Sequence, residues 1–510
     1  MFAKVFSGAV LGIEPYVIEI EVHSSSGIPG IVVVGLPDEA VKESRTRVKA
    51  AIRNSGFQFP RRKITINLAP ADIKKEGVSF DLPIALGILA VSDQIPQNCL
   101  DKHIILGELA LDGRVRPVKG VLPIALGTKK WNMEKIVIPD GNSAESSIID
   151  GIESIPVQSL ADAVDTLSGK KKVRTEGSGY KQRSSASVFY DEDIADVKGQ
   201  NHVKRAMEVA AAGGHNIILI GPPGSGKTML AKRFRTIVPD MVKDECLEVT
   251  KIYSVGGHLR NGNRIVSARP FRAPHHTISC AGLVGGGSYP VPGEVSLSHN
   301  GVLFLDEFTE FRRDALEALR QPLEDRQVNI ARTKRSVTFP ARFILVCSMN
   351  PCPCGFFTDP KIECRCTPPQ IKKYISKISG PLLDRIDIHV DVSPLKYNEM
   401  TGPGGGETSQ TIRERVCEAR ALQSKRFGGA DIVNNALMKT RQIKKYCELN
   451  SGGHALLKEA HDRLGLSARG YDKVLKIART IADLEANDNI EPHHLAEAIQ
   501  YRSLDRNIWN

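Results

Sequence analysis

A glycine-rich stretch, NIILIGPPGSGKTML, joins an apolar run to the pattern G-x-x-x-x-G-K-T. In such P-loops, backbone N–H groups surround phosphate oxygens, a lysine reaches the terminal phosphates, and a threonine hydroxyl ligates Mg²⁺ at a helix N-terminus. The pattern predicts binding of ATP with Mg²⁺, with Lys227 and Thr228 in the last two roles. The predicted loop residues are Gly221, Pro222, Pro223, Gly224, Ser225 and Gly226.

Two carboxylates, Asp306 and Glu307, follow the apolar run GVLFL. In a chain with a P-loop, such a pair is suited to hold Mg²⁺ and to orient and deprotonate the attacking water. We assign the first role to Asp306 and the second to Glu307. The alternative is that the pair only caps the helix that follows.

Three further polar residues complete a set that is typical of ring ATPases. Asn350 ends the strand-like run RFILVCSMN and is predicted to hydrogen-bond the γ-phosphate or the lytic water, although Asn before Pro also forms turns. Arg385, in SGPLLDRIDIHV, is predicted to be an arginine finger that acts on a neighbour's ATP. Arg469, in GLSARGYDKVL, is predicted to be a sensor of the chain's own ATP. An ordinary surface ion pair is the alternative for each arginine.

Four cysteines gather directly after Asn350, in NPCPCGFFTDPKIECRC. Cys352 and Cys354 form one C-x-C pair and Cys364 and Cys366 another, with nine residues between the pairs. Four thiolates match the tetrahedral requirement of Zn²⁺ in number. The spacing within each pair is tighter than the usual C-x₂₋₄-C, so a redox pair and unligated cysteines stay as alternatives. A metal would order this short segment, and we interpret the cluster as a structural clip.

The order of these motifs resembles that of AAA+ ATPases, in the magnesium-chelatase-like branch that also contains the MCM helicases. The phrases DVKGQNHVKRAMEVAAAGGHNIILIGPPGSGKTMLA, RPFRAPHH, NPCPCG and SARGYDKVLKIARTIADLE resemble the ComM/YifB family, and the resemblance spans essentially the whole chain. It implies a hexameric ring ATPase that moves on DNA. It further implies a helicase that promotes branch migration in homologous recombination during natural transformation, with other recombination proteins as further partners.

The stretch DRQVNIARTKRSVTFPARF reads as two short strands joined at RTKR. In MCM-like rings such hairpins point into the pore. The resemblance therefore implies that Arg332, Lys334 and Arg335 track DNA phosphates. The alternative is a solvated charged turn.

Two stretches near the N-terminus, KKEGVSFDLPIAL and LGELALDGRVRPVKGVLPIAL, resemble the proteolytic domain of Lon. Ser79 falls on the position of the catalytic serine, but Leu122 falls on that of the lysine, and leucine cannot activate a hydroxyl. Lys119 is three residues away, and we do not expect it to replace the missing amine. The resemblance implies a ribosomal-S5-like domain without peptidase activity, retained for assembly or DNA contact.

Pattern and composition predict an α/β multidomain chain in four parts. Residues 1–167 alternate strand and helix patterns, with Asp38 as a helix cap, and predict the Lon-like α+β domain of ribosomal-S5-domain-2 type. Residues 168–190 read as a flexible basic linker, and 191–400 as the AAA+ P-loop α/β domain with its four-cysteine insert. Residues 410–510 predict a helical lid domain.

The chain has 510 residues and a formal net charge of +11, which favours a polyanionic partner such as nucleic acid. No apolar run reaches the roughly 18 residues needed to span a bilayer, and the N-terminus reads as strand rather than signal peptide. We therefore expect a cytoplasmic protein without a membrane partner. The competing functions are the ATPase motor of a metal chelatase and a Lon-like protease, the latter disfavoured by Leu122.

Overall fold

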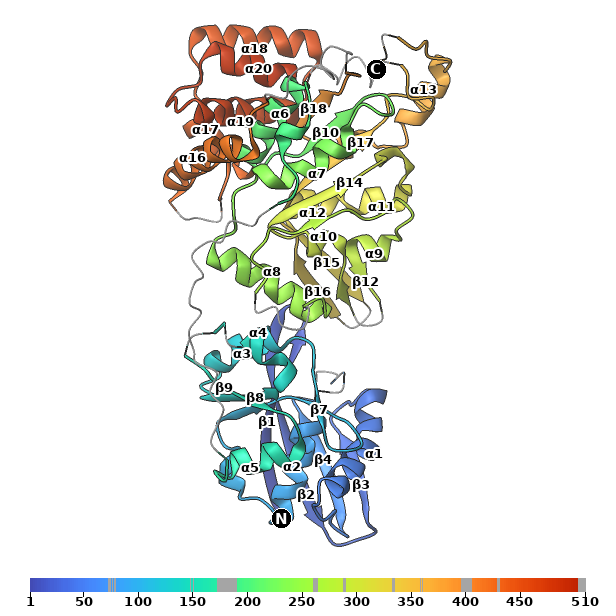
Figure 1. Cartoon of the computed structure of the whole chain (residues 1–510), viewed down its shortest axis with the longest axis vertical. Helices are drawn as coiled ribbons and strands as arrows, with labels where there is room; N and C mark the ends of the chain where they lie inside the picture. The colour runs from blue at the N-terminus through green and yellow to red at the C-terminus, as the bar shows by residue number, and fades with distance from the viewer. Residues whose placement is uncertain are drawn as a thin grey trace. The chain divides into compact units, whose positions relative to one another are not determined.

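The protein is described from a computed structural model (Figure 1). It forms two compact units, the first comprising Met1–Ala186, Lys243–Ser267 and Ala331–Phe339, the second Ser187–Val242, Ala268–Ile330 and Pro340–Asn510. Most of the predicted linker, 168–190, lies outside the described residues. The structure describes the chain apart from residues 72–74, 76, 78, 147, 150, 172–189, 260–264, 288–289, 333–334, 358, 360, 396–405, 429–431 and 503–510.

A seven-stranded mixed sheet forms the core of the first unit. In order across the sheet, its strands are β3 (Gly30–Val34), β4 (Lys63–Ala69), β2 (Glu14–Ser25), β1 (Phe2–Leu11), β5 (His103–Ile105), β8 (Lys135–Pro139) and β9 (Glu153–Val157). β1 and β2 pair antiparallel as a hairpin, turned at Gly12, whose φ of +64° is rarely adopted by residues with a side chain. β2 is also antiparallel to β4, and the other neighbours pair parallel.

Alternate residues of this sheet supply two separate cores, one on each face. On β8, Val137 belongs to one core, whereas Ile136 and Ile138 belong to the other. Successive strand residues point to opposite faces, so a strand that is covered on both sides reads as an unbroken apolar run. Asp38 caps the first helix by accepting a hydrogen bond from the Val41 N–H at 2.7 Å, which confirms the predicted cap. The helices are α1 (Glu39–Asn54), α2 (Asp81–Val91) and α5 (Leu160–Leu167) at one core, and α3 (Val121–Lys130) at the other.

The first unit also includes α8 (Lys243–Gly256), which packs against α3. The Gly120 N–H donates to the Ser254 carbonyl at 3.2 Å. The buried carboxylate of Glu145 accepts hydrogen bonds from the Leu122 N–H, at 2.8 Å, and from the Ser254 hydroxyl. The predicted ATPase range, 191–400, thus contains two segments that the structure groups with the N-terminal unit. Small elements of this unit are β6 (Glu108–Leu109), β7 (Val115–Arg116) and α4 (Ser143–Ser146).

The second unit is built on a five-stranded parallel sheet. Its strands, in order, are β11 (Phe271–Arg272), β14 (Gly301–Leu305), β17 (Phe343–Met349), β10 (Ile217–Ile220) and β18 (Ile388–Asp391). β10, β14 and β17 are buried at every position. These are the strands predicted from the apolar runs NIILI, GVLFL and RFILVCSMN, so this part of the prediction is confirmed.

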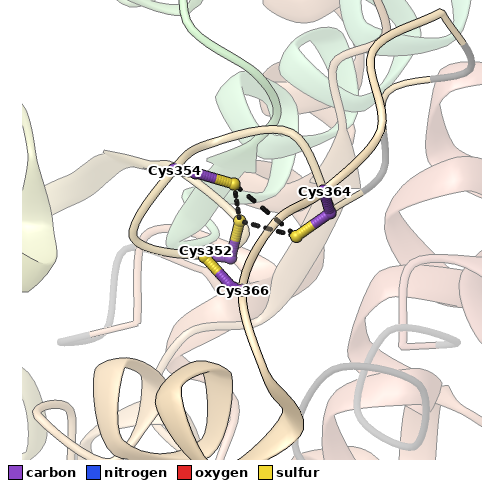
Figure 2. Close-up of side chains that lie close together, drawn as sticks. All are labelled: Cys352, Cys354, Cys364 and Cys366. Atoms are coloured by element: carbon purple, nitrogen blue, oxygen red, sulfur yellow. Dashed lines mark hydrogen bonds between the residues drawn. The ribbon is translucent and has the colours of Figure 1, made fainter.

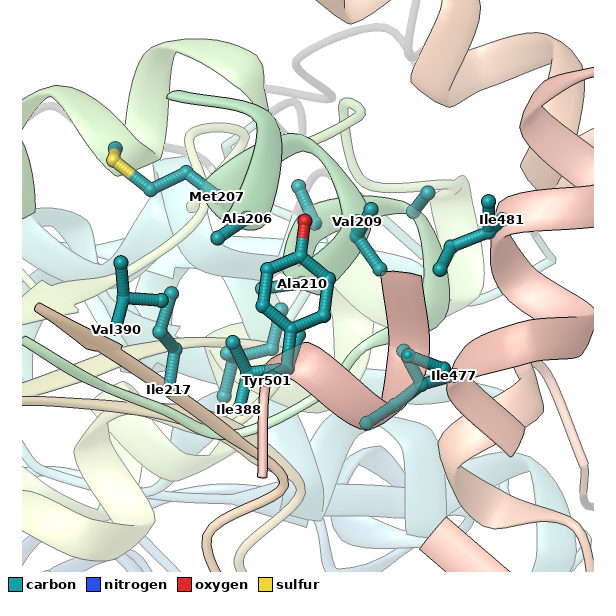
Figure 3. Close-up of a cluster of buried hydrophobic side chains, with 14 of the residues drawn as sticks. Ala206, Met207, Val209, Ala210, Ile217, Ile388, Val390, Ile477, Ile481 and Tyr501 are labelled. Atoms are coloured by element: carbon teal, nitrogen blue, oxygen red, sulfur yellow. The ribbon is translucent and has the colours of Figure 1, made fainter. Parts of the chain in front are cut away.

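The C-terminal helices share one hydrophobic core with this sheet. In Figure 3, Val209 and Ala210 of α6 (Asn201–Gly213) face Ile477 and Ile481 of α19, with strand residues such as Ile388 close by. The region predicted to be helical, 410–510, therefore packs on the ATPase core and has no separate one of its own among the residues described. The helices are α7 (Lys227–Ile237), α16 (Ser409–Phe427), α17 (Thr440–Tyr446), α18 (Ser451–Leu464), α19 (Ala468–Leu484) and α20 (Pro492–Gln500).

Short elements lie along the chain between the sheet strands of the second unit, and one stretch of them, Ala331–Phe339, belongs to the first unit. Two two-stranded sheets are described, one of β12 (Gly285–Gly286) and β13 (Val291–Pro292), the other of β15 (Gln327–Arg332) and β16 (Arg335–Pro340). The second of them confirms the two short strands predicted in DRQVNIARTKRSVTFPARF. The short helices are α9 (Cys280–Val284), α10 (Glu294–Leu297), α11 (Arg313–Ala318), α12 (Arg320–Asp325), α13 (Pro368–Ile375) and α14 (Gly380–Leu383). Among the helices described, none is long and apolar enough to cross a bilayer. The chain is therefore a mixed α/β multidomain protein with a helical C-terminal region.

Candidate functional site

The P-loop connects the end of β10 to the start of α7, as its pattern predicts. Gly224 and Gly226 have φ values of +77° and +91°, a backbone conformation that favours glycine. A Cβ on Gly221 would lie 2.2 Å from the carbonyl oxygen of Val392, so the backbone can pass here only as glycine. These constraints hold the loop around the space that a phosphate would enter.

The side chain of Lys227 hydrogen-bonds to the backbone of this loop. Its Nζ donates to the carbonyls of Gly221, at 2.7 Å, and Pro222, at 2.8 Å, and to Oδ1 of Asn350, at 3.2 Å. Burial lowers the pKa of Lys227 to about 8, against the opposing effect of the carboxylates of Asp306 and Asp391. The predicted phosphate-binding lysine and the predicted sensor asparagine are thus in direct contact.

The acidic pair follows β14. The Thr228 hydroxyl donates to Oδ2 of Asp306 at 2.8 Å, and the Ser348 hydroxyl donates to Oδ1 of the same carboxylate. A hydroxyl and a carboxylate side by side are the hard oxygen ligands that Mg²⁺ prefers, so these two residues fit the predicted magnesium site. Glu307, in contrast, has a side chain that is 61% exposed, which leaves its carboxylate accessible to water.

His276 is a residue at this site to which we assign no role from sequence alone. Its Nδ1 lies 3.2 Å from Oε2 of Glu307, and its ring packs against that of His275 with the centroids 4.1 Å apart. The contact puts an imidazole nitrogen within hydrogen-bond distance of the Glu307 carboxylate. The histidine pair in RPFRAPHH was the only sequence signal of this position.

A cavity of about 920 Å³ brings these groups together. Its volume is in the range typical of pockets for small molecules the size of a nucleotide. The predicted residues that line it include Lys227, Thr228, Asp306, Glu307 and Asn350. The side of the cavity beyond Asn350 is formed by Pro353, Cys354, Arg365 and Cys366.

Arg385 and Arg469 lie together at a different place. Both guanidinium groups pair with the carboxylate of Glu324, Arg469 with a distance of 3.3 Å from Nη2 to Oε1. All three residues line a second cavity of about 220 Å³, which shares no residue with the first among those described. The two arginines predicted to act at different sites are therefore neighbours.

The strand topology explains the separation. β10 and β18 pair in parallel from Ile217↔Ile388 to Ile220↔Asp391. The P-loop follows the carboxyl end of β10, whereas Arg385 precedes the amino end of β18. Four strand residues span about 13 Å. Arg385 thus lies at the end of the strands opposite its own P-loop. The predicted role of Arg469 as a sensor of the chain's own ATP does not fit this position, because its helix begins beside Arg385.

A buried polar network holds the amino end of β18 in place. The Asn216 side chain donates to the Arg385 carbonyl at 3.0 Å and accepts from the Leu345 N–H at 2.9 Å. Lys473 Nζ lies 2.9 Å from Oδ1 of Asp387, which ties the arginine-bearing segment to α19. The Lys473 ammonium holds the pKa of the buried Asp387 carboxyl well below its usual range, despite the opposing effect of burial.

The four cysteines form one cluster (Figure 2). The sulfur of Cys352 is 3.3 Å from that of Cys354 and 3.7 Å from that of Cys364, and the Cys354 and Cys364 sulfurs are 3.6 Å apart. Ligand atoms of all four residues, including Cys366, lie within 4.8 Å of one another. Sulfurs about 2.3 Å from a tetrahedral Zn²⁺ are about 3.8 Å apart, so the cluster fits the ion.

A second group of potential metal ligands comprises Glu485, His493 and His494. Nδ1 of His494 accepts the Glu491 N–H at 2.9 Å, so its Nε2 carries the proton and donates to Glu485 at 3.0 Å. A protonated Nε2 has no lone pair for a metal. Hydrogen bonding therefore accounts for this group.

Among the residues described, the first unit shows no serine–lysine pair like that of Lon. Leu122 is fully buried in the core under α3, and Lys119 lies against Gly257. Within the part of the chain described, the Ser79 hydroxyl makes no hydrogen bond, and its carbonyl accepts from the Gly107 N–H at 3.0 Å. A serine without a base has no route to activation.

The structure describes only part of the segment predicted to contact DNA. Arg332 and Arg335 belong to β15 and β16, at the ends where the two strands connect. Lys334 and the side chains of both arginines lie outside the described residues. Their role stays a prediction.

Comparison with known proteins covers nearly the whole chain. Residues 193–400 match the family described as magnesium chelatase, subunit ChlI, residues 20–142 match the family described as subunit ChlI of Mg-chelatase, and residues 406–502 match the ChlI C-terminal family. The chain is 44% identical to competence protein ComM of Haemophilus influenzae over 508 residues, covering 99% of this chain and 98% of that protein. It is 43% identical to the uncharacterized protein YifB of Escherichia coli, covering 98% and 97%. A shorter similarity, 30% over 172 residues, links 32% of the chain to 30% of Lon protease 2 of Bacillus subtilis.

Proposed function

The chain belongs to the ComM/YifB family of magnesium-chelatase-like ATPases, and from this premise we propose that it is an ATP-driven DNA translocase that works as a hexameric ring. Its task would be that of a helicase that promotes branch migration in homologous recombination, in natural transformation. The observation that carries the ATPase part is the cavity that joins Lys227, Thr228, Asp306, Glu307 and Asn350.

The chemistry follows from these contacts. Lys227 would leave its carbonyl partners for the terminal phosphates, and Thr228 with Asp306 would hold Mg²⁺, which neutralises charge on the phosphate oxygens. Glu307 would orient a water and take its proton as the water oxygen bonds to the γ-phosphorus. The bond from that phosphorus to the bridging oxygen breaks, and ADP leaves with the electron pair.

The paired arginines support the ring. Arg385 and Arg469 line a different cavity from that of their own P-loop, so they would complete the site of an adjacent copy of the chain and stabilise the charge on its γ-phosphate. This replaces the expected cis role of Arg469 with a role in trans.

DNA as the partner is supported by the net charge of +11 and by the basic sequence RTKR, at which β15 ends and β16 begins. The test is ATP hydrolysis measured without nucleic acid, with single-stranded DNA and with forked DNA, at several salt concentrations. We expect DNA to raise turnover and salt to weaken DNA binding, because bound counterions are released. The triple variant Arg332→Ala, Lys334→Ala, Arg335→Ala should lose the stimulation but keep the basal rate.

A second candidate function is the ATPase motor of a metal chelatase, favoured by the matches to ChlI over three segments. The Lon-like region has no evident use in such a motor. If neither DNA raises turnover and DNA binding shows no dependence on salt, the translocase proposal fails and the chelatase motor gains. The variant Lys227→Ala, without hydrolysis in either case, is the control for contaminating ATPases.

The four-cysteine cluster would hold one Zn²⁺ as a structural clip on the loop that leaves β17. Elemental analysis of the purified protein should find about one zinc per chain, and the double variant Cys352→Ser, Cys364→Ser should lose it. Less than about one zinc for every four chains would exclude a structural site.

A further inference from the structure

Arg365 stands between two members of the thiol cluster, Cys364 and Cys366, and lines the nucleotide cavity. Its guanidinium makes no hydrogen bond or ion pair with any residue that the structure describes. Lys377, on the same wall, is in contrast engaged with Glu310, with N···O distances of 3.3 Å. An arginine without a partner in a cavity built for an anion has five donors to offer.

The thiol cluster limits where Arg365 can go. Its backbone N–H donates to the Cys354 sulfur, and both neighbouring residues contribute thiols to the cluster. The same loop packs on the P-loop at Gly355, where a Cβ would lie 2.5 Å from Cδ of Pro223. The backbone of Arg365 is therefore anchored to the element that binds the phosphates.

The charges of the cavity match a phosphate chain. Four cationic side chains and three acidic ones line it, and the acidic ones include both predicted catalytic carboxylates. The cations are Lys227, Arg365, Lys373 and Lys377, and the acids are Asp306, Glu307 and Glu310. A guanidinium binds phosphate oxygens through two parallel N–H donors, a geometry that an ammonium cannot reproduce.

We propose that Arg365 is a further nucleotide-binding residue, whose guanidinium contacts a phosphate oxygen of the ATP at the chain's own P-loop and is presented there by the four-cysteine clip. The inference rests on the proposed ATPase function and gives the clip a second role. Zinc at the cluster would then support triphosphate binding as well as local order.

The test is equilibrium binding of fluorescent, non-hydrolysable ATP and of fluorescent ADP and AMP. Arg365→Ala should weaken binding of the triphosphate by about tenfold, because a charge-assisted hydrogen bond is lost, and should leave AMP unchanged. Arg365→Lys should recover only part of the loss. Lys361→Ala is the matched control, since Lys361 is exposed on the same loop but does not line the cavity.

A second experiment tests whether the four-cysteine clip positions Arg365. Removal of zinc with a chelator should reduce triphosphate affinity in the parent protein and cause no further loss in Arg365→Ala. Unchanged triphosphate binding in Arg365→Ala, or an equal loss for AMP, overturns the assignment. An additive effect of zinc removal overturns the presentation by the clip. Lys227→Ala separates this failure from that of the proposed function: if it too leaves binding unchanged, the ATPase proposal itself is lost.

Discussion

The two ends of the parallel strands in the second unit differ in what they lack. We call the end at which the strands finish the carboxyl edge and the end at which they begin the amino edge. At the carboxyl edge, Lys227 donates to Asn350 and Thr228 donates to Asp306, so the residues predicted to bind Mg²⁺ and phosphate meet within one chain. At the amino edge, two arginines are assembled around Glu324, in a cavity that shares none of its described lining residues with the one at the P-loop. One chain therefore carries two separate groups of predicted ATPase residues, and the proposed ring would join the arginines of one copy to the nucleotide cavity of the next.

Loss of the arginine finger should have the largest effect. Arg385→Ala should lower ATP turnover by about 10³-fold or more while ATP binding is kept, because the charge stabilised in the transition state belongs to another chain's site. Mixing Arg385→Ala with Lys227→Ala should restore turnover, since some interfaces then join an intact P-loop to an intact arginine. Each variant alone is the control. No recovery on mixing, in rings verified to be mixed, would place Arg385 at its own chain's site and break the comparison.

At the carboxyl edge, Glu307→Gln should reduce turnover by about 10²-fold to 10³-fold with ATP binding intact, because the amide cannot accept the proton of the attacking water. Steady-state hydrolysis and equilibrium binding of a fluorescent ATP analogue measure the two quantities separately. Glu310→Gln is the matched control, since Glu310 lies in the same cavity wall but is paired with Lys377. Undiminished turnover in Glu307→Gln would remove this residue from its role.

The sequence was sufficient for the carboxyl edge and insufficient for the amino edge. The P-loop, Asp306 with Glu307, and Asn350 each directly follow an apolar run, and parallel strands bring their carboxyl ends together whatever the rest of the chain does. The amino edge joins Glu324 to residues 61 and 145 positions away, Arg385 and Arg469. No local pattern encodes such a meeting, because it depends on the order of the strands and the packing of α19.

The boundary between the two units could not be predicted from the sequence either, because it too depends on contacts between residues far apart along the chain. α8 lies within the range predicted as ATPase, yet its Ser254 bonds to Glu145 of the first unit. The amphipathic pattern of a helix shows that one face is buried but not which partner covers it. By contrast, the four cysteines are close in sequence, and their cluster could be predicted from spacing alone.

The charge state of Lys227 gives an intermediate effect, confined to the carboxyl edge. Burial lowers its pKa to about 8, so the amine loses its proton as the pH rises through this value, whereas bound phosphate favours the protonated form. ATP affinity should therefore be full below about pH 8 and fall by up to about tenfold per pH unit above it. Binding titrations from about pH 7 to pH 9.5 measure this. Lys227→Arg stays charged throughout and should show no such decline. A flat profile in the parent protein would contradict the low pKa.

The smallest effect is expected at Glu324, whose carboxylate occupies both arginines where a neighbour's phosphate would otherwise bind them. Glu324→Gln keeps the shape of the side chain but removes its charge, so the arginines become freer to bind the phosphate. Turnover at low protein concentration should rise by less than about fivefold, because an exposed ion pair contributes a free energy of this scale. Glu317→Gln is the control, because Glu317 pairs with Arg320 at 3.0 Å and contacts neither arginine. Hydrolysis measured over a range of protein concentrations separates easier assembly from faster chemistry. A fall toward the level of Arg385→Ala would instead mean that Glu324 must hold the arginines in place, and the amino edge would then be as firmly assembled as the carboxyl edge.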